Sequence, residues 1–191
     1  MLDEGLIAHI GFADPDSGEP TVIPVAYARD GDRILFHGST GSRLFMTLKE
    51  GAPICVAITL LDGIVVARSP FNSSMNYRSV MVFGVAKVLD GEDKIHGLRA
   101  VSEKLVPGLW DAGREQTAKE FAQTMLAELA LDDVTAKKRV GGPLDSEDSA
   151  LPIWAGVIPV KTSLGEPITH NDSHHVEVPA YVRRHVERHS W

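Results

Sequence analysis

The sequence has few of the residues that crosslink or anchor proteins. Its 191 residues include one cysteine, Cys55, which excludes an intramolecular disulfide framework and any zinc or iron–sulfur site built from several cysteines. No apolar run approaches the roughly 18 residues that a membrane helix requires. The start of the chain carries Asp3 and Glu4 instead of the basic residues of a signal peptide. We therefore expect a soluble, cytoplasmic protein that neither spans nor binds a membrane.

Basic residues are also scarce. Lysine and arginine total 19 against 26 for aspartate and glutamate, a formal charge of −7, which argues against a nucleic-acid binder. Hydrophobic residues make up 43% and charged residues 24%, as in an ordinary globular protein. Without repeats or low-complexity stretches, we expect one domain over residues 1–168, followed by a polar, histidine-rich tail over residues 169–191.

Short apolar segments separated by turn residues dominate the first ninety residues, which predicts strands. Asp30-Gly31-Asp32 predicts a hairpin turn, and Pro24 predicts a strand edge or bulge because proline lacks a ladder donor. Apolar residues on both faces of 77–89 predict a strand that is covered on both sides. The expected strands are 6–12, 21–28, 33–37, a pair 53–60 and 63–68 joined at residues 61–63, the long strand 77–89, and 153–160.

Helices are expected at 42–50, 94–105 and 179–189. A further helix is expected over 115–131, because Ala118, Phe121, Met125 and Leu129 repeat at helical spacing. Together these elements predict a mainly β, α+β protein: a six-stranded antiparallel split β-barrel with peripheral helices.

Residues 36–43, Phe-His-Gly-Ser-Thr-Gly-Ser-Arg, run from a predicted strand into a predicted helix. Glycines allow a ligand to approach the backbone, while hydroxyls, free amides and Arg43 can satisfy phosphate oxygens. The segment therefore predicts a phosphate-monoester site. The alternative is that Ser39, Thr40 or Ser42 only caps the helix. A second polar cluster, residues 73–79, enters the long strand, and its side chains either meet a ligand or tie down their own loop.

Taken together, these segments resemble the flavin-nucleotide-binding branch of the pyridoxamine 5'-phosphate oxidase-like family, which is related to the 5-nitroimidazole resistance proteins. Their order and spacing match over residues 6–160. The segments that carry the resemblance are Pro24-Val25-Ala26-Tyr27, residues 36–43, Leu61-Asp62-Gly63, residues 75–80 with Phe83-Gly84, and residues 153–159. The resemblance implies a split-barrel homodimer with FMN at the subunit interface.

The resemblance also implies which residues would meet the cofactor. Residues 39, 40, 42 and 43 would hold the FMN phosphate, the strand at residues 24–27 would run beside the flavin ring, and residues 78 and 79 would approach it from a neighbouring strand. His37 matches a histidine of the 5-nitroimidazole resistance proteins and could protonate a substrate or orient a ring; a structural role is the alternative. The implied cofactor-binding residues are Pro24, Val25, Ala26, Tyr27, His37, Ser39, Thr40, Ser42, Arg43, Arg78, Ser79 and Trp154, the last of which would ordinarily be a buried core residue.

The chain departs from the true oxidases in two segments. The C-terminal segment of those oxidases contains an Arg and a His that bind the substrate phosphate. The corresponding segment here is residues 165–172, which contains no arginine. Residues 90–105 offer no counterpart of their substrate-binding Tyr and Arg. We therefore expect an FMN-dependent oxidoreductase with an unknown small-molecule substrate or electron donor, and not a vitamin B6 oxidase. The alternatives are a flavin-storage module without turnover and a haem-binding split barrel, with His37 or a tail histidine as ligand.

The remaining candidate side chains predict no further site. Five of the eight histidines lie in the tail, at positions 170, 174, 175, 185 and 189, but their spacing forms no known chelating motif, so no metal is expected. Cys55 lies between apolar strand residues, which predicts a buried, unreactive thiol.

Overall fold

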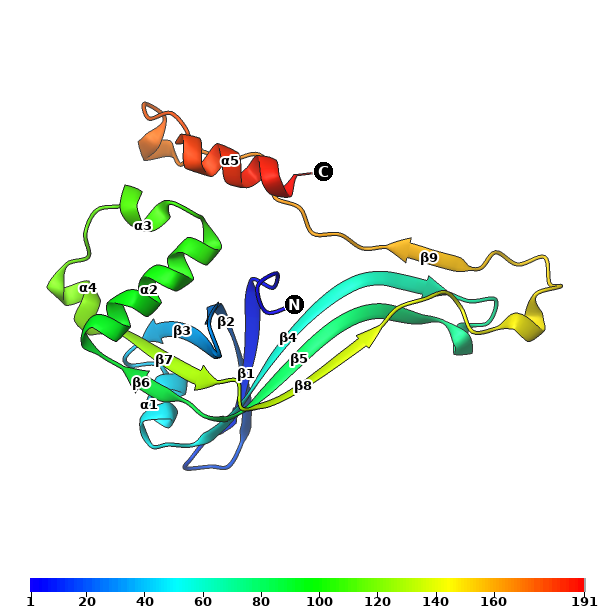
Figure 1. Cartoon of the computed structure of the whole chain (residues 1–191), viewed down its shortest axis with the longest axis horizontal. Helices are drawn as coiled ribbons and strands as arrows, with labels where there is room; N and C mark the ends of the chain where they lie inside the picture. Colours follow the sequence, from blue (N-terminus) through cyan, green and yellow to red (C-terminus); the bar gives the residue numbers. More distant parts are fainter. Residues whose placement is uncertain (191) are drawn as a thin grey trace.

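A curled antiparallel sheet organises the chain, and the computed structural model describes residues 1–190 of it (Figure 1). The order of hydrogen-bonded neighbours is β6-β7-β3-β2-β1-β4-β5-β8, and β9 pairs with β4 outside this path. The strands are β1 (Ile7–Ala13), β2 (Pro20–Asp30), β3 (Arg33–Ser39), β4 (Pro53–Val66), β5 (Ser74–Val85), β6 (Lys87–Leu89), β7 (Thr124–Ala130), β8 (Asp133–Arg139) and β9 (Gly156–Pro159).

Helices lie at the periphery of this sheet, as expected. They are α1 (Arg43–Lys49), α2 (Gly91–Leu105), α3 (Leu109–Ala112), α4 (Ala118–Gln123) and α5 (Ala180–His189), with short 3-10 turns at Pro70–Asn72, Ser146–Asp148 and Asn171–Ser173. The predicted split barrel is confirmed. The predicted number of six strands is wrong, because nine strands form the sheet.

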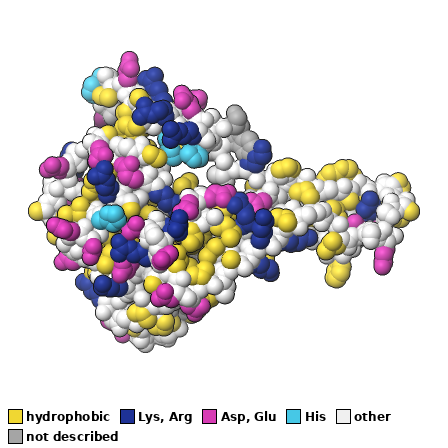
Figure 2. Space-filling model, in the orientation of Figure 1, with side chains coloured by type: hydrophobic (Ala, Val, Ile, Leu, Met, Phe, Trp, Pro, Cys, Tyr) yellow, Lys and Arg dark blue, Asp and Glu magenta, His cyan; other side chains and the backbone are white. Residues whose placement is uncertain are grey.

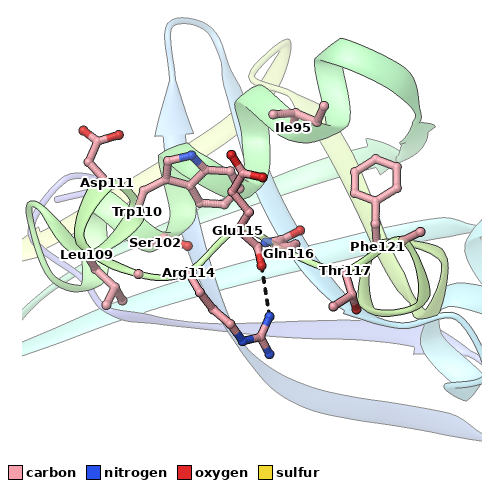
Figure 3. A pocket seen from close by; sticks show the side chains of 12 residues that line it. Ile95, Ser102, Leu109, Trp110, Asp111, Arg114, Glu115, Gln116, Thr117 and Phe121 are labelled. Atoms are coloured by element: carbon pink, nitrogen blue, oxygen red, sulfur yellow. Dashed lines mark hydrogen bonds between the residues drawn. The ribbon is translucent and has the colours of Figure 1, made fainter.

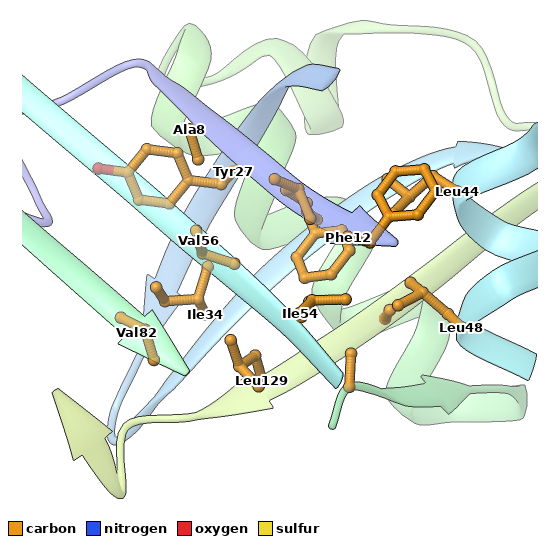
Figure 4. Packing of buried hydrophobic residues seen from close by; sticks show 14 of the residues in the cluster. Ala8, Phe12, Tyr27, Ile34, Leu44, Leu48, Ile54, Val56, Val82 and Leu129 are labelled. Carbon is orange, nitrogen blue, oxygen red and sulfur yellow. The ribbon is translucent and has the colours of Figure 1, made fainter. Parts of the chain in front are cut away.

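Two apolar clusters hold the fold together. The larger one fills the barrel and includes Ile10, Tyr27, Phe36 and Phe45 (Figure 4). The smaller one lies between the outer face of β3 and β7 and helix α2, and it contains Leu35. Strand β3 therefore has apolar neighbours on both faces, which fixes its position and that of the segment that follows it.

The helix predicted over residues 115–131 is wrong. A capping box of Thr117 and Glu120 starts α4, which ends after six residues, and the chain continues as β7. Met125 packs into the barrel cluster and Leu126 into the cluster under α2. Because both faces of β7 are buried, its sequence lacks the alternation of polar and apolar residues that marks a half-exposed strand.

The pair of strands predicted at residues 53–60 and 63–68 is also wrong. Residues 53–66 form the single strand β4 of 14 residues, and its pairing with β5 shifts between Leu61 and Gly63. The outer part of β4 and β5 projects from the barrel and, together with β9, forms an extension that we call the arm (residues 61–77 and 140–159; Figure 1).

The arm and the adjoining face of β5 are rich in exposed apolar side chains (Figure 2). The exposed fraction of Phe71 is 94% and that of Leu144 is 84%. Met81, Phe83 and Val85 are exposed on β5, so the prediction that this strand is covered on both faces is wrong within one chain. An apolar surface of this kind usually marks an interface.

Other local predictions agree with the structure. The 30–32 turn joins β2 to β3, with Gly31 at a φ of 57°. Strand β9 and helices α1, α2 and α5 fall within or close to their expected ranges. Helix α5 at the end of the predicted tail packs Tyr181 next to Gly108. Over the described residues, no helix is long and apolar enough to cross a membrane.

Candidate functional site

The predicted phosphate segment forms a corner between β3 and α1, which we call the corner (His37–Arg43). Ser42 is the N-cap of α1, and its hydroxyl oxygen accepts a hydrogen bond from the amide of Phe45 at 3.4 Å. A Cβ on Gly38 would lie 2.6 Å from the Phe45 ring, so glycine is needed there for packing. Ser42 therefore caps α1, and its hydroxyl oxygen has a second lone pair that could accept a further hydrogen bond.

A hollow of about 700 Å³ opens at the corner, and we call it the corner hollow. Its lining residues are His37, Gly38, Ser39, Thr40, Gly41, Gln123 and Thr124. The amide of Thr40 donates to the carbonyl oxygen of Gln123 at 3.0 Å, which joins the corner to the end of α4. Three of the predicted residues, His37, Ser39 and Thr40, thus line one cavity that is large enough for a ligand.

His37 has an unusual environment. Its Nδ1 is buried and has no hydrogen-bond partner within residues 1–190. Burial lowers the pKa of His37 from its ordinary value of 6.5, so the imidazole is neutral at pH 7. A buried polar atom without a partner is costly, and such atoms often mark a site where a ligand completes the bonding.

Arg43 is the charged residue of the corner. Its side chain is 61% exposed, and its nearest acid is Asp14, with 3.7 Å between Nε and the carboxylate oxygen. An ion pair this long and exposed contributes little to stability. The guanidinium is therefore available to bind an anion next to the corner.

Residues Pro24–Tyr27 lie on β2, where the sheet opens. Pro24, Val25 and Ala26 pair with β1, whereas β2 pairs with β3 only from Tyr27 onward. Pro24, Val25 and Ala26 therefore have a strand partner on one side, which confirms the expected edge at Pro24 and leaves backbone groups exposed on the other side. Tyr27 itself is buried, and its hydroxyl donates to the carbonyl oxygen of Leu2 at 2.7 Å.

Arg78 and Ser79 lie on β5, away from the corner within one chain. The Arg78 guanidinium pairs with Asp62 at 2.7 Å and also with Glu4. Two carboxylates therefore already neutralise it. Ser79 is half-buried opposite Thr59 of β4.

Trp154 is not a core residue. Its side chain is 64% exposed on the arm, just before β9, and its ring lies against Gly156. The alternative that Trp154 is a buried core residue is therefore wrong. Figure 1 shows β9 far from α1 in one chain, so the structure does not bring Trp154 to the corner of its own subunit.

Gln123 and Thr124 are two residues of the site that the sequence pattern did not predict. Both line the corner hollow, but residues 115–131 were expected to be one continuous helix on the periphery. A capping box at Thr117 and Glu120 marks a helix start in the sequence, although nothing comparable marks where the helix ends.

Two further expectations concern metals and the cysteine. Within the described part of the chain, no three His, Cys, Asp or Glu side chains gather as a metal site would require. Cys55 is partly buried, and burial raises the pKa of its thiol, which agrees with an unreactive residue.

The chain is similar to known proteins in both sequence and structure. Residues 1–138 match the family model described as pyridoxamine 5'-phosphate oxidase. The structure resembles that of the FAD and heme binding protein from Mycobacterium smegmatis, with a TM-score of 0.90 and 39% identity over 96% of this chain and 90% of that one. It also resembles the flavocytochrome Anf3 from Azotobacter vinelandii, with a TM-score of 0.88 and 39% identity over 96% and 86% of the two chains.

A more distant structure shares the fold alone. The 5-nitroimidazole antibiotic resistance protein from Bacteroides thetaiotaomicron has a TM-score of 0.54 and 17% identity over 70% of this chain and 77% of that one. No curated protein matches the sequence. The two structures with 39% identity each cover 96% of this chain.

Proposed function

The chain belongs to the pyridoxamine 5'-phosphate oxidase family, and from this premise we propose that it is a flavin-binding redox protein that works as a homodimer. The observation that carries the proposal is the corner, where an unpartnered imidazole and two hydroxyls line one cavity and the exposed Arg43 follows directly in the sequence. These are groups that a flavin nucleotide can satisfy, and the similar proteins with 39% identity are described as FAD and heme binding and as a flavocytochrome.

The residues of the corner fit the phosphate end of a flavin. Arg43 offers a charge-assisted contact, while Ser39 and Thr40 offer hydroxyl groups at the mouth of the cavity. The open edge of β2 at Pro24–Ala26 offers backbone groups to the polar edge of the ring. When bound, the flavin supplies the electron transfer, and the chain binds it, orients it and keeps water from it.

The corner can hold the phosphate of either flavin nucleotide, so the choice between FMN and FAD rests on the similar proteins. The family resemblance predicts FMN, whereas the Mycobacterium smegmatis protein binds FAD. Both flavins carry the phosphate that the corner would hold. We propose FAD, because that protein covers 96% of this chain at 39% identity.

Haem is a second candidate cofactor, and His37 supports it. Iron binds the neutral imidazole, and burial keeps His37 in that form at pH 7. His96 and His189 fit less well, since His96 lies 3.2 Å from Asp30 and His189 bonds the backbone of its own helix. We propose that haem, where it binds, takes His37 as its axial ligand.

The homodimer is proposed because the predicted cofactor-binding residues lie in two separate parts of one chain. His37 and Arg43 belong to the corner, whereas Trp154 lies on the arm, too far away to meet them in one chain (Figure 1). A second copy would cover the apolar arm and bring its own Trp154 towards this chain's corner. The exposed side chains Phe71 and Leu144 favour such a partner surface.

A visible spectrum tests the cofactors directly. The full chain, purified without added cofactor, should absorb near the flavin bands, and mass spectrometry of what heat releases should give FAD. Haem titration should produce a Soret band. A colourless protein that neither FAD nor FMN reconstitutes would overturn the flavin proposal. Electron transfer from NADH or NADPH to any acceptor would separate an oxidoreductase from a flavin-storage module.

A further inference from the structure

A second hollow, of about 900 Å³, lies between α2, α3 and α4 (Figure 3). We call it the α4 pocket. Its apolar lining includes Ile95, Leu109, Trp110 and Phe121. Trp110 and Phe121 each pack partly against the cluster under α2, and their remaining surface lines the pocket. A cavity of this size and lining suits a small ligand.

The polar groups of the pocket favour a ligand that carries hydrogen-bond donors. The Arg114 guanidinium is held by both carboxylate oxygens of Glu120, and Asp111 pairs with Arg99 at 2.8 Å. Glu115 and Gln116 also line the pocket, the first with a carboxylate that accepts hydrogen bonds and the second with an amide that donates and accepts them. Aromatic walls with such groups suit a planar heterocyclic base that bears an amino group, because every base has faces that stack on aromatic side chains.

Helix α4 separates the two hollows. Ala118 and Phe121 line the α4 pocket, whereas Gln123 and the adjoining Thr124 line the corner hollow. The six residues of α4 extend about 9 Å at 1.5 Å per residue. A ligand with its phosphate at the corner would therefore need an extension of about the length of α4 to place a ring in the α4 pocket. FMN ends at its phosphate, whereas FAD continues through a second phosphate and a ribose to an adenine.

We propose that the α4 pocket is the subsite for the adenine of FAD, with Trp110 as the stacking residue. The proposal rests on the proposed flavin function and extends it. It gives the segment from α3 to α4 a role in flavin binding. Phosphate binding at the corner alone would give that segment none. It also gives the chain a physical reason to prefer FAD over FMN.

The test compares three ligands on the full chain after flavin removal: FMN, FAD and AMP, each titrated to a dissociation constant. We expect FAD to bind at least tenfold more tightly than FMN. Trp110→Ala should weaken FAD roughly tenfold and leave FMN unchanged, because stacking on one base is lost. Trp110→Phe should keep most of the preference, and Lys119→Ala, an exposed residue of α4 outside the lining, should change nothing.

Ala118→Trp provides a variant that fills the pocket without removing a packed ring. It should abolish the preference for FAD while FMN binds as before. Equal affinities for FAD and FMN in the unaltered chain, or variants that weaken both flavins alike, would overturn the subsite. Tight, Trp110-dependent binding of AMP that FAD does not displace would assign the pocket to a free nucleotide instead. Loss of the subsite leaves FMN binding intact, whereas failure to bind either flavin overturns the proposed function and the subsite together.

Discussion

The amide of Thr40 and the carbonyl oxygen of Gln123 form a hydrogen bond of 3.0 Å that ties the corner to the end of α4. The bond continues the pairing of β3 with β7, whose last pair is Ser39 with Thr124. The shape of the corner hollow is therefore fixed by two segments that lie more than eighty residues apart. Both the proposed phosphate site and the proposed adenine subsite depend on this junction.

Arg43→Ala is expected to weaken flavin binding without unfolding the protein. A charge-assisted contact to phosphate contributes about 1.5–3 kcal/mol, which corresponds to roughly a 10- to 150-fold loss of affinity. The side chain is 61% exposed, so the melting temperature should stay the same. Lys49→Ala, on the same helix, is the control. Unchanged flavin affinity in Arg43→Ala, and also in its combination with Ser42→Ala, would show that the phosphate lies elsewhere.

His37→Ala is expected to remove the Soret band of the haem-loaded chain. Protons compete with iron for the imidazole, and the pKa of His37 lies below 6.5. Haem binding should therefore persist as the pH falls to 6.5 and weaken only below that value. The measurement is a series of haem titrations across acidic pH. A His185→Ala variant serves as the control, and a Soret band that survives in His37→Ala but not in His185→Ala would move the ligand to α5.

Lys104 should make the stability depend on pH in mildly alkaline solution. Its ammonium lies over the Tyr27 ring, and burial lowers its pKa from 10.5 to about 8. Between these values the unfolded chain holds a proton that the folded chain has released, so the free energy of unfolding should rise with pH. Lys104→Met should flatten this rise in urea titrations from pH 8 to 10, and Lys119→Met should not. The pKa of Tyr27 is raised to about 12, which acts in the opposite direction only above pH 10.

Phe71→Asp combined with Leu144→Asp is expected to produce monomers. Both side chains belong to the arm and are largely exposed in one chain, so a partner that covers them would have to bury two carboxylates. Sedimentation at micromolar concentration should give twice the chain mass for the unaltered protein and about half of that for the variant. Ile168→Asp, at a residue with 97% exposure outside the arm, is the control. An unaltered chain that is monomeric yet retains flavin would contradict the shared site.

Asp145→Ala should loosen the arm and leave the barrel intact. The buried carboxylate accepts hydrogen bonds from the Arg68 amide at 2.6 Å and from Nη1 of its guanidinium at 3.1 Å. Its loss leaves partly buried donors unsatisfied, at a cost of about 1–3 kcal/mol. Hydrogen exchange should accelerate in residues 66–70 and 140–150, whereas protection of β3 and β7 stays the same. Glu147→Ala, which is exposed on the neighbouring turn, should have no effect.

Much of the fold was determined by local chemistry in the sequence. The turn at Gly31 produced the expected hairpin, and the apolar stripe of residues 44, 45 and 48 produced the expected helix α1. The corner was predictable because its hydroxyls, glycines and arginine are contiguous. The open edge at Pro24 was predictable because proline removes a donor wherever it stands.

Only the tertiary structure decided what long-range contacts control. Residues 124–130 became a strand because β3 and β6 pair with it on either side, which overrode a helical spacing of apolar residues. Trp154 became an exposed residue of the arm because β9 pairs with the outer end of β4, outside the barrel. The unpartnered Nδ1 of His37 and the two hollows beside α4 arise where distant segments meet. Spacing along the chain specifies the neighbours of a residue within one element, but it does not specify which face another element will bury.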